Sequence, residues 1–405
     1  MPTETLPTLL VLASTYPRWK DDHEPGFVHE LAKRLTNRFH VIAVVPSAPG
    51  AAVRETLDGV EVIRYRYAPR RFETLVNDGG IVTNLQRHHW KLLLVPTFVW
   101  AQAWRTWHLL RTRQIDVIHA HWLLPQGLIA AVLGQLSGRA PPFLVTSHGA
   151  DLFALRGKGL NALKRFVARK AAAVTVVSDA MRDELARMGA DVGSVEVQPM
   201  GVDLAERFVP DPATKRSHDE ILFVGRLVEK KGLRHLIDAM PSILRARPSA
   251  HLTVVGFGPE EAERRTQVEN LGLHGKIHFA GALSQGDLPA RYQRAAVFVA
   301  PFAEASSGDQ EGLGLVCLEA AGCGCPVVVS DLPATRKVLP EGAGCIRVAP
   351  SDSAALADAV VDVLTRREIH LCGVEAFRES IAESFDWRVV GQNYASILEA
   401  CIDRG

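Results

Sequence analysis

Short apolar runs recur along the whole 405-residue chain, and most are separated by segments long enough to form a helix. Such alternation is typical of a parallel sheet with crossover helices. A chain of this length exceeds one ordinary core, so two domains of about 200 residues are expected. We therefore predict an α/β fold of two doubly wound domains. The runs are 8–15, 41–46, 60–65, 117–120, 143–147, 174–178 and 195–198, then 221–225, 252–256, 277–281, 297–301, 327–330 and 345–348.

The predicted domain boundary lies beside a polar, proline-containing stretch at 201–217. The first domain is expected to span 1–203 and the second 204–385. An apolar pattern at 389–402 predicts a final helix, within about 386–405, that crosses back onto the first domain. Ligands of doubly wound sheets bind beyond the carboxyl ends of the strands, so the two domains are expected to face each other across a cleft.

Charge and cysteine usage bound the class of protein. Residues 1–200 carry 24 Lys and Arg against 17 Asp and Glu, whereas residues 201–405 carry 22 against 28, so different partners are expected for the two halves. All six cysteines lie in the second half without a Cys-x-x-Cys motif, which indicates buried thiols in a reducing cytosol rather than a metal site. No secretory signal pattern is recognisable at the N-terminus, so a cytoplasmic protein is expected.

The stretch 311–331 combines two carboxylates with a glycine-rich turn, a helical segment and a buried strand. Glu311 and Glu319 would lie about 12 Å apart along the helix, so a ligand that reaches both must be elongated. Backbone N–H groups at a helix N-terminus favour an anion between them. A buried helix with two incidental glutamates explains the same pattern equally well. The turn residues expected at the anion are Gly312, Leu313, Gly314 and Leu315.

A second cluster follows the apolar run 221–225. Gly225, Arg226 and Lys231 stand between this run and a helical pattern that begins at Leu233. The planar fork of arginine and the compact charge of lysine could together hold a diphosphate. They could also stabilise the negative charge that grows on the diphosphate as it leaves. A solvated charged turn is the alternative, for which Lys230 is the better example.

The first half offers candidates at three strand ends. Gly26 lies at the start of a helix and would let a ligand approach the backbone closely, although an ordinary turn glycine is also credible. The absence of Gly-x-Gly-x-x-Gly there argues against a dinucleotide dehydrogenase. His148 and Asp151 follow the run 143–147 and could bond sugar hydroxyls. His119 and His121 share a strand face and are interpreted as lining or core residues, since a third metal ligand is missing.

Tryptophan and basic residues alternate in the stretch 85–113, as Trp90, Trp100 and Trp104 stand among arginines. This combination fits a membrane interface, while the apolar part is too short to span a bilayer. A long helix packed on the sheet with some exposed tryptophans is an equally good interpretation. Peripheral contact with an anionic membrane is therefore a hypothesis for this stretch.

Taken together and in order, these motifs resemble the retaining family 4 glycosyltransferases of GT-B fold. The resemblance covers nearly the whole chain. The residues that carry it are Glu311-x7-Glu319, the turn from Gly225 to Gly232, Pro199-Met-Gly201-Val-Asp203, Ser147-His148-Gly149 and Asp116-Val-Ile-His-Ala-His121-Trp122.

The resemblance implies a nucleotide-diphosphate sugar as donor, without cofactor or metal. The second domain would bind the donor and the first the acceptor, a glycan or a lipid-linked or small-molecule hydroxyl. Arg226 and Lys231 would grip the diphosphate, Glu311 the donor sugar and Glu319 the ribose. His148 would lie near the transferred sugar, with Asp151 and His121 close to sugar or acceptor and Gly26 approaching the diphosphate. No nucleic-acid partner is expected.

Two positions depart from the family pattern. Met200 stands where asparagine is frequent, and Pro25-Gly26 stands where two adjacent glycines are frequent, which weakens the expected contact of the first domain with phosphate. Two alternatives to a transferase stay open from sequence. One is a nucleotide-sugar epimerase of similar architecture, and the other is a non-catalytic nucleotide-sugar-binding protein.

Overall fold

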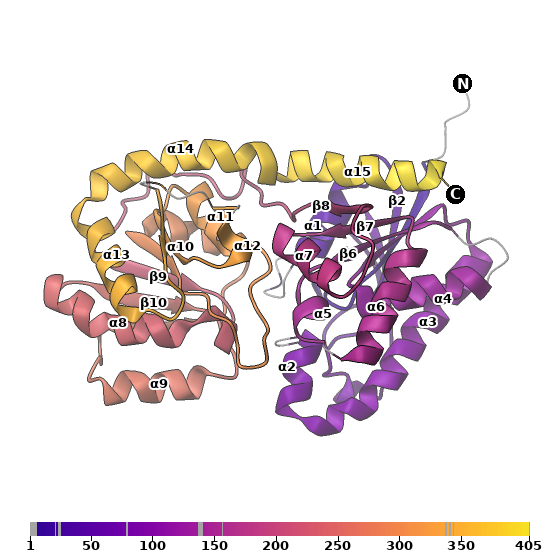
Figure 1. Ribbon diagram of the computed structural model, residues 1–405, viewed down its shortest axis with the longest axis horizontal. Helices are drawn as coiled ribbons and strands as arrows, with labels where there is room; N and C mark the ends of the chain where they lie inside the picture. The colour runs from indigo at the N-terminus through magenta and orange to yellow at the C-terminus, as the bar shows by residue number, and fades with distance from the viewer. Residues whose placement is uncertain are drawn as a thin grey trace. The chain divides into compact units, whose positions relative to one another are not determined.

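The structure is a computed structural model that describes residues 6–20, 22, 26–77, 80–136, 141–155, 157–336, 338–339, 342 and 344–404. The chain divides into two compact units (Figure 1). Unit 1 comprises Met1–Met200 and Val390–Gly405, and unit 2 comprises Gly201–Val389.

Unit 1 is built on an eight-stranded sheet in the order β3-β4-β2-β1-β5-β6-β7-β8. All neighbouring strands are parallel except β3, which pairs antiparallel with β4 at one edge. The order reverses between β1 and β5, so the carboxyl ends of these two strands form the switch point at which ligands of such sheets bind. The strands are β1 (Thr8–Leu12), β2 (His40–Pro46), β3 (Arg54–Leu57), β4 (Val60–Tyr65), β5 (Val117–His121), β6 (Phe143–Ser147), β7 (Ala173–Val176) and β8 (Val195–Val197).

Helices of unit 1 connect and cover these strands, as Figure 1 shows. The last helix, α15 (Trp387–Asp403), belongs to this unit from Val390 onward. Tyr394 of that helix is fully buried, and its hydroxyl donates to the Gln198 carbonyl at 3.0 Å. The others are α1 (Phe27–Arg34), η1 (Arg70–Phe72), α2 (Gly80–Arg87), η2 (His89–Leu93), α3 (Leu94–Thr112), η3 (Leu123–Gly127), α4 (Leu128–Leu136), α5 (Ala150–Phe153), α6 (Lys158–Lys170) and α7 (Asp179–Arg187).

Unit 2 holds a six-stranded, entirely parallel sheet in the order β11-β10-β9-β12-β13-β14. Its switch point lies between β9 and β12. The strands are β9 (Glu220–Val224), β10 (His251–Val255), β11 (Ile277–Gly281), β12 (Val297–Ala300), β13 (Val327–Ser330) and β14 (Cys345–Val348). The helices are η4 (Glu229–Lys231), α8 (Leu233–Ala246), α9 (Glu261–Asn270), α10 (Leu288–Arg294), α11 (Leu315–Gly322), α12 (Pro333–Arg336), α13 (Ser353–Thr365) and α14 (Arg367–Phe385).

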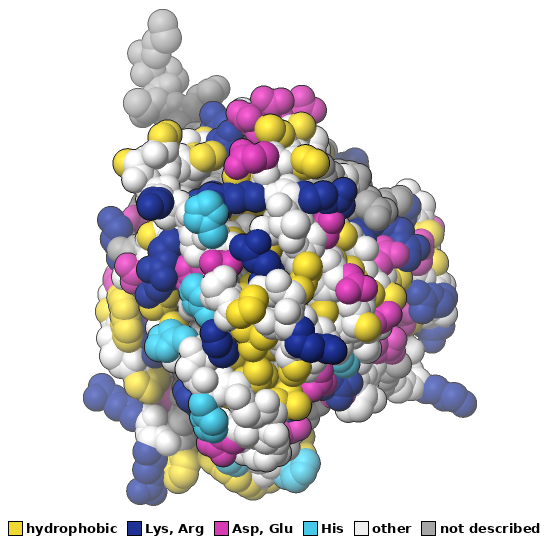
Figure 2. Space-filling model, turned by 90° about the vertical axis from the view of Figure 1, so that its left-hand side faces the viewer, with side chains coloured by type: hydrophobic (Ala, Val, Ile, Leu, Met, Phe, Trp, Pro, Cys, Tyr) yellow, Lys and Arg dark blue, Asp and Glu magenta, His cyan; other side chains and the backbone are white. Residues whose placement is uncertain are grey.

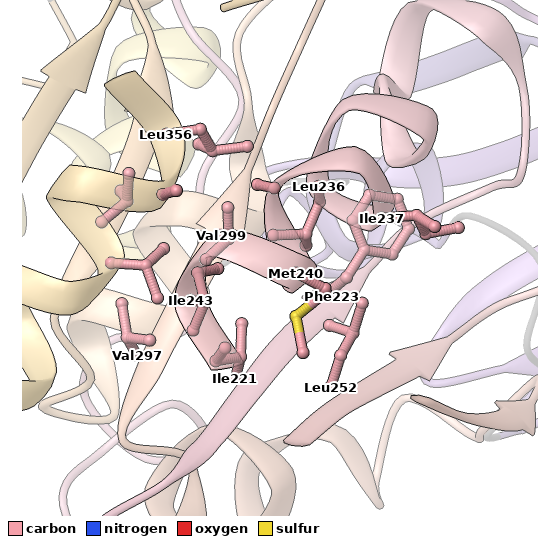
Figure 3. Close-up of a cluster of buried hydrophobic side chains, with 14 of the residues drawn as sticks. Ile221, Phe223, Leu236, Ile237, Met240, Ile243, Leu252, Val297, Val299 and Leu356 are labelled. Carbon is pink, nitrogen blue, oxygen red and sulfur yellow. The ribbon is translucent and has the colours of Figure 1, made fainter. Parts of the chain in front are cut away.

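The core of unit 2 forms where α8 and α13 pack on the sheet (Figure 3). Leu236, Met240 and Ile243 on one face of α8 are fully buried against Ile221 of β9 and Val297 of β12. Their spacing of three and four residues puts these side chains on one helix stripe, while the parallel strands are apolar on both faces. This core fixes the strand ends that carry the candidate site. On the face viewed in Figure 2, basic, acidic and apolar side chains are intermixed.

The predicted α/β architecture of two doubly wound units is confirmed. Every one of the thirteen predicted runs overlaps a strand. The antiparallel edge strand β3 was missed, because its sequence Arg-Glu-Thr-Leu lacks the apolar continuity of a buried parallel strand.

Candidate functional site

The turn after β9 carries the basic residues of unit 2. The amide of Gly225 donates to the Val255 carbonyl at 3.0 Å, and the chain then passes through η4 into α8. Gly232, between η4 and α8, has φ +69, and a Cβ there would lie 1.7 Å from the carbonyl oxygen of Pro301. Only glycine therefore permits this turn to press against the chain that leaves β12. The glycine thus brings the turn to the switch point of the sheet.

Lys231 pairs with Glu311 across that switch point. Lys231 Nζ lies 2.8 Å from Glu311 Oε2 and 4.8 Å from the ring centroid of Phe302. The neighbouring Lys230 forms a parallel pair, with its Nζ 3.0 Å from Asp309 Oδ2. Two consecutive lysines thus bind two carboxylates of the loop before α11. Cation and carboxylate thus both lie at the carboxyl ends of β9 and β12, where ligands of such sheets bind.

The carboxylate of Glu311 is held ionised. Burial by itself would raise its pKa, but the charges of Lys231 and Lys230, with hydrogen bonds from Lys231 and the Gly314 amide, together lower the pKa to about 2. The Gly314 N–H donates to Glu311 Oε1 at 3.2 Å, and Gly314 adopts φ +82 directly before α11. In this structure the Gly314 amide is thus engaged by the Glu311 carboxylate, and a contact of the turn's amides with a phosphate stays a prediction. The helix begins one residue later, at Leu315.

Glu319 lies one turn from the end of α11 and accepts a hydrogen bond from Tyr292. The phenolic oxygen of Tyr292, a fully buried residue of α10, donates to Glu319 Oε2 at 2.9 Å. Burial raises the pKa of Glu319 to about 7, although the Tyr292 hydrogen bond and the charges of Lys231 and Arg207 oppose this. Two carboxylates of one motif thus have pKa values displaced in opposite directions. Sequence reasoning did not identify Tyr292 as part of this arrangement.

The remaining predicted residues of unit 2 fall on the same two segments. Arg226 is half-buried and directly follows Gly225 in the turn after β9, and its carbonyl accepts from the Val228 amide at 2.9 Å. Gly312 and Leu313 are buried in the bend that precedes α11. Unit 2 therefore gathers Lys231, Glu311 and the start of α11 at one strand-end region.

In unit 1 the histidines form a buried cluster at the ends of β5 and β6. His121 Nδ1 and His148 Nε2 lie 2.9 Å apart, and His119 Nε2 bonds the Thr146 hydroxyl at 2.7 Å. Burial lowers the pKa of all three histidines, to about 3 for His119 and His148. The rings are accordingly neutral at pH 7, and His121 is an internal support for His148. His121 is 1% exposed, which agrees with the lining or core interpretation.

Asp151 uses both carboxylate oxygens inside unit 1. Its Oδ2 accepts from the Leu123 amide at 2.7 Å and its Oδ1 from the Ser147 hydroxyl at 2.7 Å. The residue is 2% exposed, and burial raises its pKa. It fastens the segment after β5 to the end of β6. A contact of Asp151 with sugar stays a prediction.

Gly26 is the N-cap residue of α1, and the residue after it, Phe27, contacts His148. A Cβ at Gly26 would meet no described atom within 4 Å, and its φ of −91 is open to any residue. Phe27, which follows it, lies with its ring centroid 4.9 Å from that of His148, and Trp122 lies 5.1 Å from the same ring. Packing among the described residues thus does not require glycine here, and none of them fills the position of a Cβ. The adjoining Pro25 lies outside the described residues.

Within the described part of the chain, no group of three or more His, Cys, Asp or Glu side chains is arranged to hold a metal ion. The same ranges contain no helix both long and apolar enough to cross a bilayer.

Sequence profiles of two families match consecutive parts of the chain. The profile described as "Glycosyltransferase Family 4" matches residues 27–206, and that described as "Glycosyl transferases group 1" matches residues 206–373. The first lies almost wholly in unit 1 and the second in unit 2.

Among curated proteins, similarity extends over most of the chain. A phosphatidyl-myo-inositol mannosyltransferase of Mycobacterium leprae is 32% identical over 302 residues, which cover 72% of this chain and 75% of that protein. A GDP-mannose-dependent alpha-(1-6)-phosphatidylinositol monomannoside mannosyltransferase of Mycolicibacterium smegmatis is 31% identical over 282 residues, 66% of this chain and 73% of the relative. A glycogen synthase of Mycobacterium tuberculosis is 27% identical over 391 residues, 92% and 90% of the two chains.

Solved structures share the fold. A sucrose-phosphate synthase from Thermosynechococcus elongatus superposes with a TM-score of 0.79 at 21% identity, over 98% of this chain and all of that one. Anabaena HepE in complex with UDP and glucose gives a TM-score of 0.73 at 18% identity, over 97% and 99% of the two chains. The architecture of the two units is thus the one known as GT-B.

Proposed function

The chain belongs to glycosyltransferase family 4, and from that membership we propose that it moves a hexose-type sugar from a UDP- or GDP-linked donor to a hydroxyl acceptor with retention at the anomeric carbon. The acceptor is a glycan, a lipid-linked sugar or a small-molecule hydroxyl. The observation that carries the proposal is the Lys231–Glu311 pair at the switch point of unit 2. A cation there suits a diphosphate and a carboxylate suits sugar hydroxyls.

We assign the donor to unit 2. Arg226 and Lys231 hold the diphosphate, Glu311 and the start of α11 bind the donor sugar and phosphate, and Glu319 accepts from the ribose hydroxyls. Glu311 fits its role because its low pKa keeps it an acceptor at any physiological pH. The Tyr292 hydrogen bond occupies one oxygen of Glu319 and directs the other to a ligand. In the described residues, Glu319 Oε1 has no hydrogen-bond partner.

We assign the acceptor to unit 1, with His148 beside the transferred sugar. A neutral imidazole can donate to or accept from a sugar hydroxyl, and burial favours that form of His148. The His121 hydrogen bond fixes which His148 nitrogen is left for a ligand. Gly26 leaves space for a diphosphate near its backbone.

The reaction exchanges one bond at the anomeric carbon. The bond from this carbon to the diphosphate oxygen breaks, and the bond to the acceptor oxygen forms on the same face of the sugar. The acceptor's proton passes to the leaving diphosphate. Lys231 and Arg226 stabilise the charge that grows on the diphosphate, which requires no metal ion. The co-substrate is the nucleotide sugar itself, and no separate cofactor takes part.

The relatives set the order in which acceptor classes are to be tested, and they leave both donor bases in the test. Two mannosyltransferases are similar at 31% and 32% identity, one of them named as GDP-mannose-dependent and both named for a phosphatidylinositol acceptor. Against this, one structural relative was solved with UDP and glucose. We therefore keep both nucleotide bases and place lipid-linked acceptors first.

We place the enzyme in the cytoplasm, at the inner face of the cell membrane. The six cysteines are all unpaired in the structure, and five of them are buried, as expected in a reducing compartment. The nucleotide-sugar donor would then come from the cytoplasm.

The test uses purified protein with UDP- and GDP-linked glucose, galactose and mannose. Acceptor-dependent release of the nucleoside diphosphate is expected with one donor, with unchanged rate in EDTA and an unchanged anomeric configuration by NMR. Interconversion of the donor without acceptor would instead identify an epimerase. Tight donor binding without turnover for any acceptor would identify a binding protein, and inversion would overturn the retaining assignment.

A further inference from the structure

An exposed apolar face runs along η2 and α3 in unit 1. Its members are Trp90, Leu92, Leu93, Trp100 and Trp104, with exposed fractions of 47%, 55%, 78%, 65% and 54%. We call these five residues the α3 face. So many large apolar side chains in 15 consecutive positions exceed the scattered exposure that is usual on protein surfaces.

Helix geometry separates this face from the side that packs on the sheet. Leu93, Trp100 and Trp104 are seven and four positions apart and so share one side of the helix. On the other side Phe98 packs against Tyr65 at a ring distance of 5.6 Å, and Gln102 Nε2 donates to the Ala13 carbonyl at 3.3 Å. The fold therefore uses the inner side of α3 and gains no core packing from the outer side.

Trp100 and Trp104 of the α3 face form a continuous aromatic surface with Trp107. The Trp100 and Trp104 rings stack with centroids 5.9 Å apart and an angle of 15° between their planes. Trp104 lies 5.1 Å from Trp107, over whose ring the Arg111 guanidinium sits at 5.5 Å. Trp90 meets Phe72 edge-to-face at 5.9 Å. Aromatic rings with polar tips beside arginine match the headgroup region of a bilayer.

The segment that carries the α3 face has charged side chains of one sign only. No Asp or Glu occurs between Asp78 and Asp116, whereas Arg87 and Arg111 are exposed and Arg105 is half-buried. Lys91 does not contribute, because it is buried with its Nζ donating to the Thr74 carbonyl at 2.8 Å. Outward charge on η2 and α3 is therefore positive.

We propose that the α3 face docks on an anionic lipid bilayer, with Trp100, Trp104 and Leu93 at headgroup depth and the arginines at lipid phosphates. A second copy of the chain fits less well. A two-fold contact through this face would set arginines against arginines with no carboxylate in the segment to pair them. The contact is peripheral, since no helix among the described residues could span the bilayer.

Flotation with vesicles tests the docking without reference to sugar transfer. Wild-type protein is expected to float with vesicles of phosphatidylcholine and phosphatidylglycerol at 7:3 and low salt, less at high salt, and weakly with phosphatidylcholine alone. Tryptophan emission should shift to shorter wavelength on binding.

Two double variants separate the apolar and ionic parts. Trp100→Ser with Trp104→Ser should remove most of the emission shift, with Trp90 as the remaining tryptophan of the face, and most of the flotation. Arg105→Ala with Arg111→Ala should weaken partitioning about 25-fold, at about fivefold for each arginine near an anionic surface. Leu271→Ser with Ile369→Ser, which removes exposed apolar residues of unit 2, serves as the matched control and should float like wild type. Thermal unfolding of each variant checks the fold.

Failure of the wild type to float with anionic vesicles at low salt would overturn the proposal, as would unchanged flotation of the tryptophan variant. A concentration-dependent dimer that the tryptophan variant loses would assign the face to a second copy and also overturn it. Because lipid binding is measured without substrate, these outcomes are independent of whether the transferase assignment holds.

Discussion

Lys231 Nζ lies 2.8 Å from Glu311 Oε2, although the two residues are 80 positions apart in the chain. The contact joins the turn after β9 to the loop before α11 and lowers the pKa of Glu311. The cation proposed for the diphosphate and the carboxylate proposed for the sugar therefore depend on each other.

Replacement of Lys231 by alanine should lower kcat about 100-fold. Loss of one charged donor to a leaving oxyanion costs roughly 3 kcal/mol of transition-state stabilisation. The measurement is single-turnover sugar transfer at saturating donor. Lys215→Ala removes an exposed lysine of unit 2 and should retain full turnover. Wild-type kcat in the Lys231 variant would exclude it from charge stabilisation.

Donor binding should weaken as the pH falls through about 7, because protonation removes a ribose acceptor from Glu319. The hydrogen bond from Tyr292 lowers the pKa of Glu319, and Tyr292→Phe removes it. The acidic limb of the kcat/KM profile should therefore move to higher pH. The pH profile of kcat/KM with respect to donor is the measurement. Tyr394→Phe removes another buried hydroxyl hydrogen bond, to a carbonyl in unit 1, and should leave the profile in place.

The raised pKa of Glu319 also predicts how stability depends on pH, with a definite sign. The folded pKa of Glu319 lies above the 4.5 that is usual for a glutamate, so its favourable contribution to folding is complete below pH 4.5 and is lost as the pH rises through about 7. The stability of Glu319→Gln relative to wild type should therefore increase as the pH rises from 5 to 8, because only wild type loses this contribution. A constant difference in the free energy of unfolding over this range would contradict the raised pKa.

The histidine cluster should destabilise unit 1 in acid. The folded pKa of His121 is lowered by burial and by His119 and His148, so its contribution is complete above pH 6.5 and is lost as the pH falls below it. His121→Asn removes one group that takes up a proton on unfolding. The slope of the free energy of unfolding against pH should therefore fall by about 1.4 kcal/mol per pH unit between pH 6 and 5. Urea unfolding at several pH values measures it. His274→Asn changes an exposed histidine and should keep the wild-type slope.

Gly26→Ala should leave the melting temperature unchanged and raise the donor KM several-fold. The new Cβ meets no described atom within 4 Å, so the described part of the protein accepts it, whereas a diphosphate close to this backbone would collide with it. Gly286→Ala, in a loop where the Cβ would lie 3.7 Å from the Ser284 hydroxyl, should change neither quantity. A donor KM equal to wild type would remove Gly26 from the phosphate contact.

The fold could be predicted from sequence because buried parallel strands are continuous apolar runs, and these stand out between helical segments. Val297–Ala300 and Val327–Ser330 are examples in which the pattern located the strand within a residue. Edge strand β3 has no such signature. Its pairing with β4 is a property of the assembled sheet.

The site could be predicted where a motif lies in one segment and not where packing decides the partner. The turn from Gly225 to Lys231 and the loop at Glu311 are motifs of the first kind. Tyr292 stands between arginine and glutamine in α10 and resembles a surface residue, yet it is fully buried on Glu319, 27 positions away. The internal hydrogen bonds of Asp151 likewise depend on how η3 meets the end of β6.

Helix α15 makes unit 1 discontinuous along the chain. Tyr394, stacked on His119 at 5.6 Å, fills space beside β5 that a fragment of residues 1–200 would leave open to water. Expression of the amino-terminal half alone should therefore yield an aggregation-prone product. Chimeras that exchange this half between relatives must carry residues 390–404 with it. A single crossover near residue 200 would separate unit 1 from its own last helix.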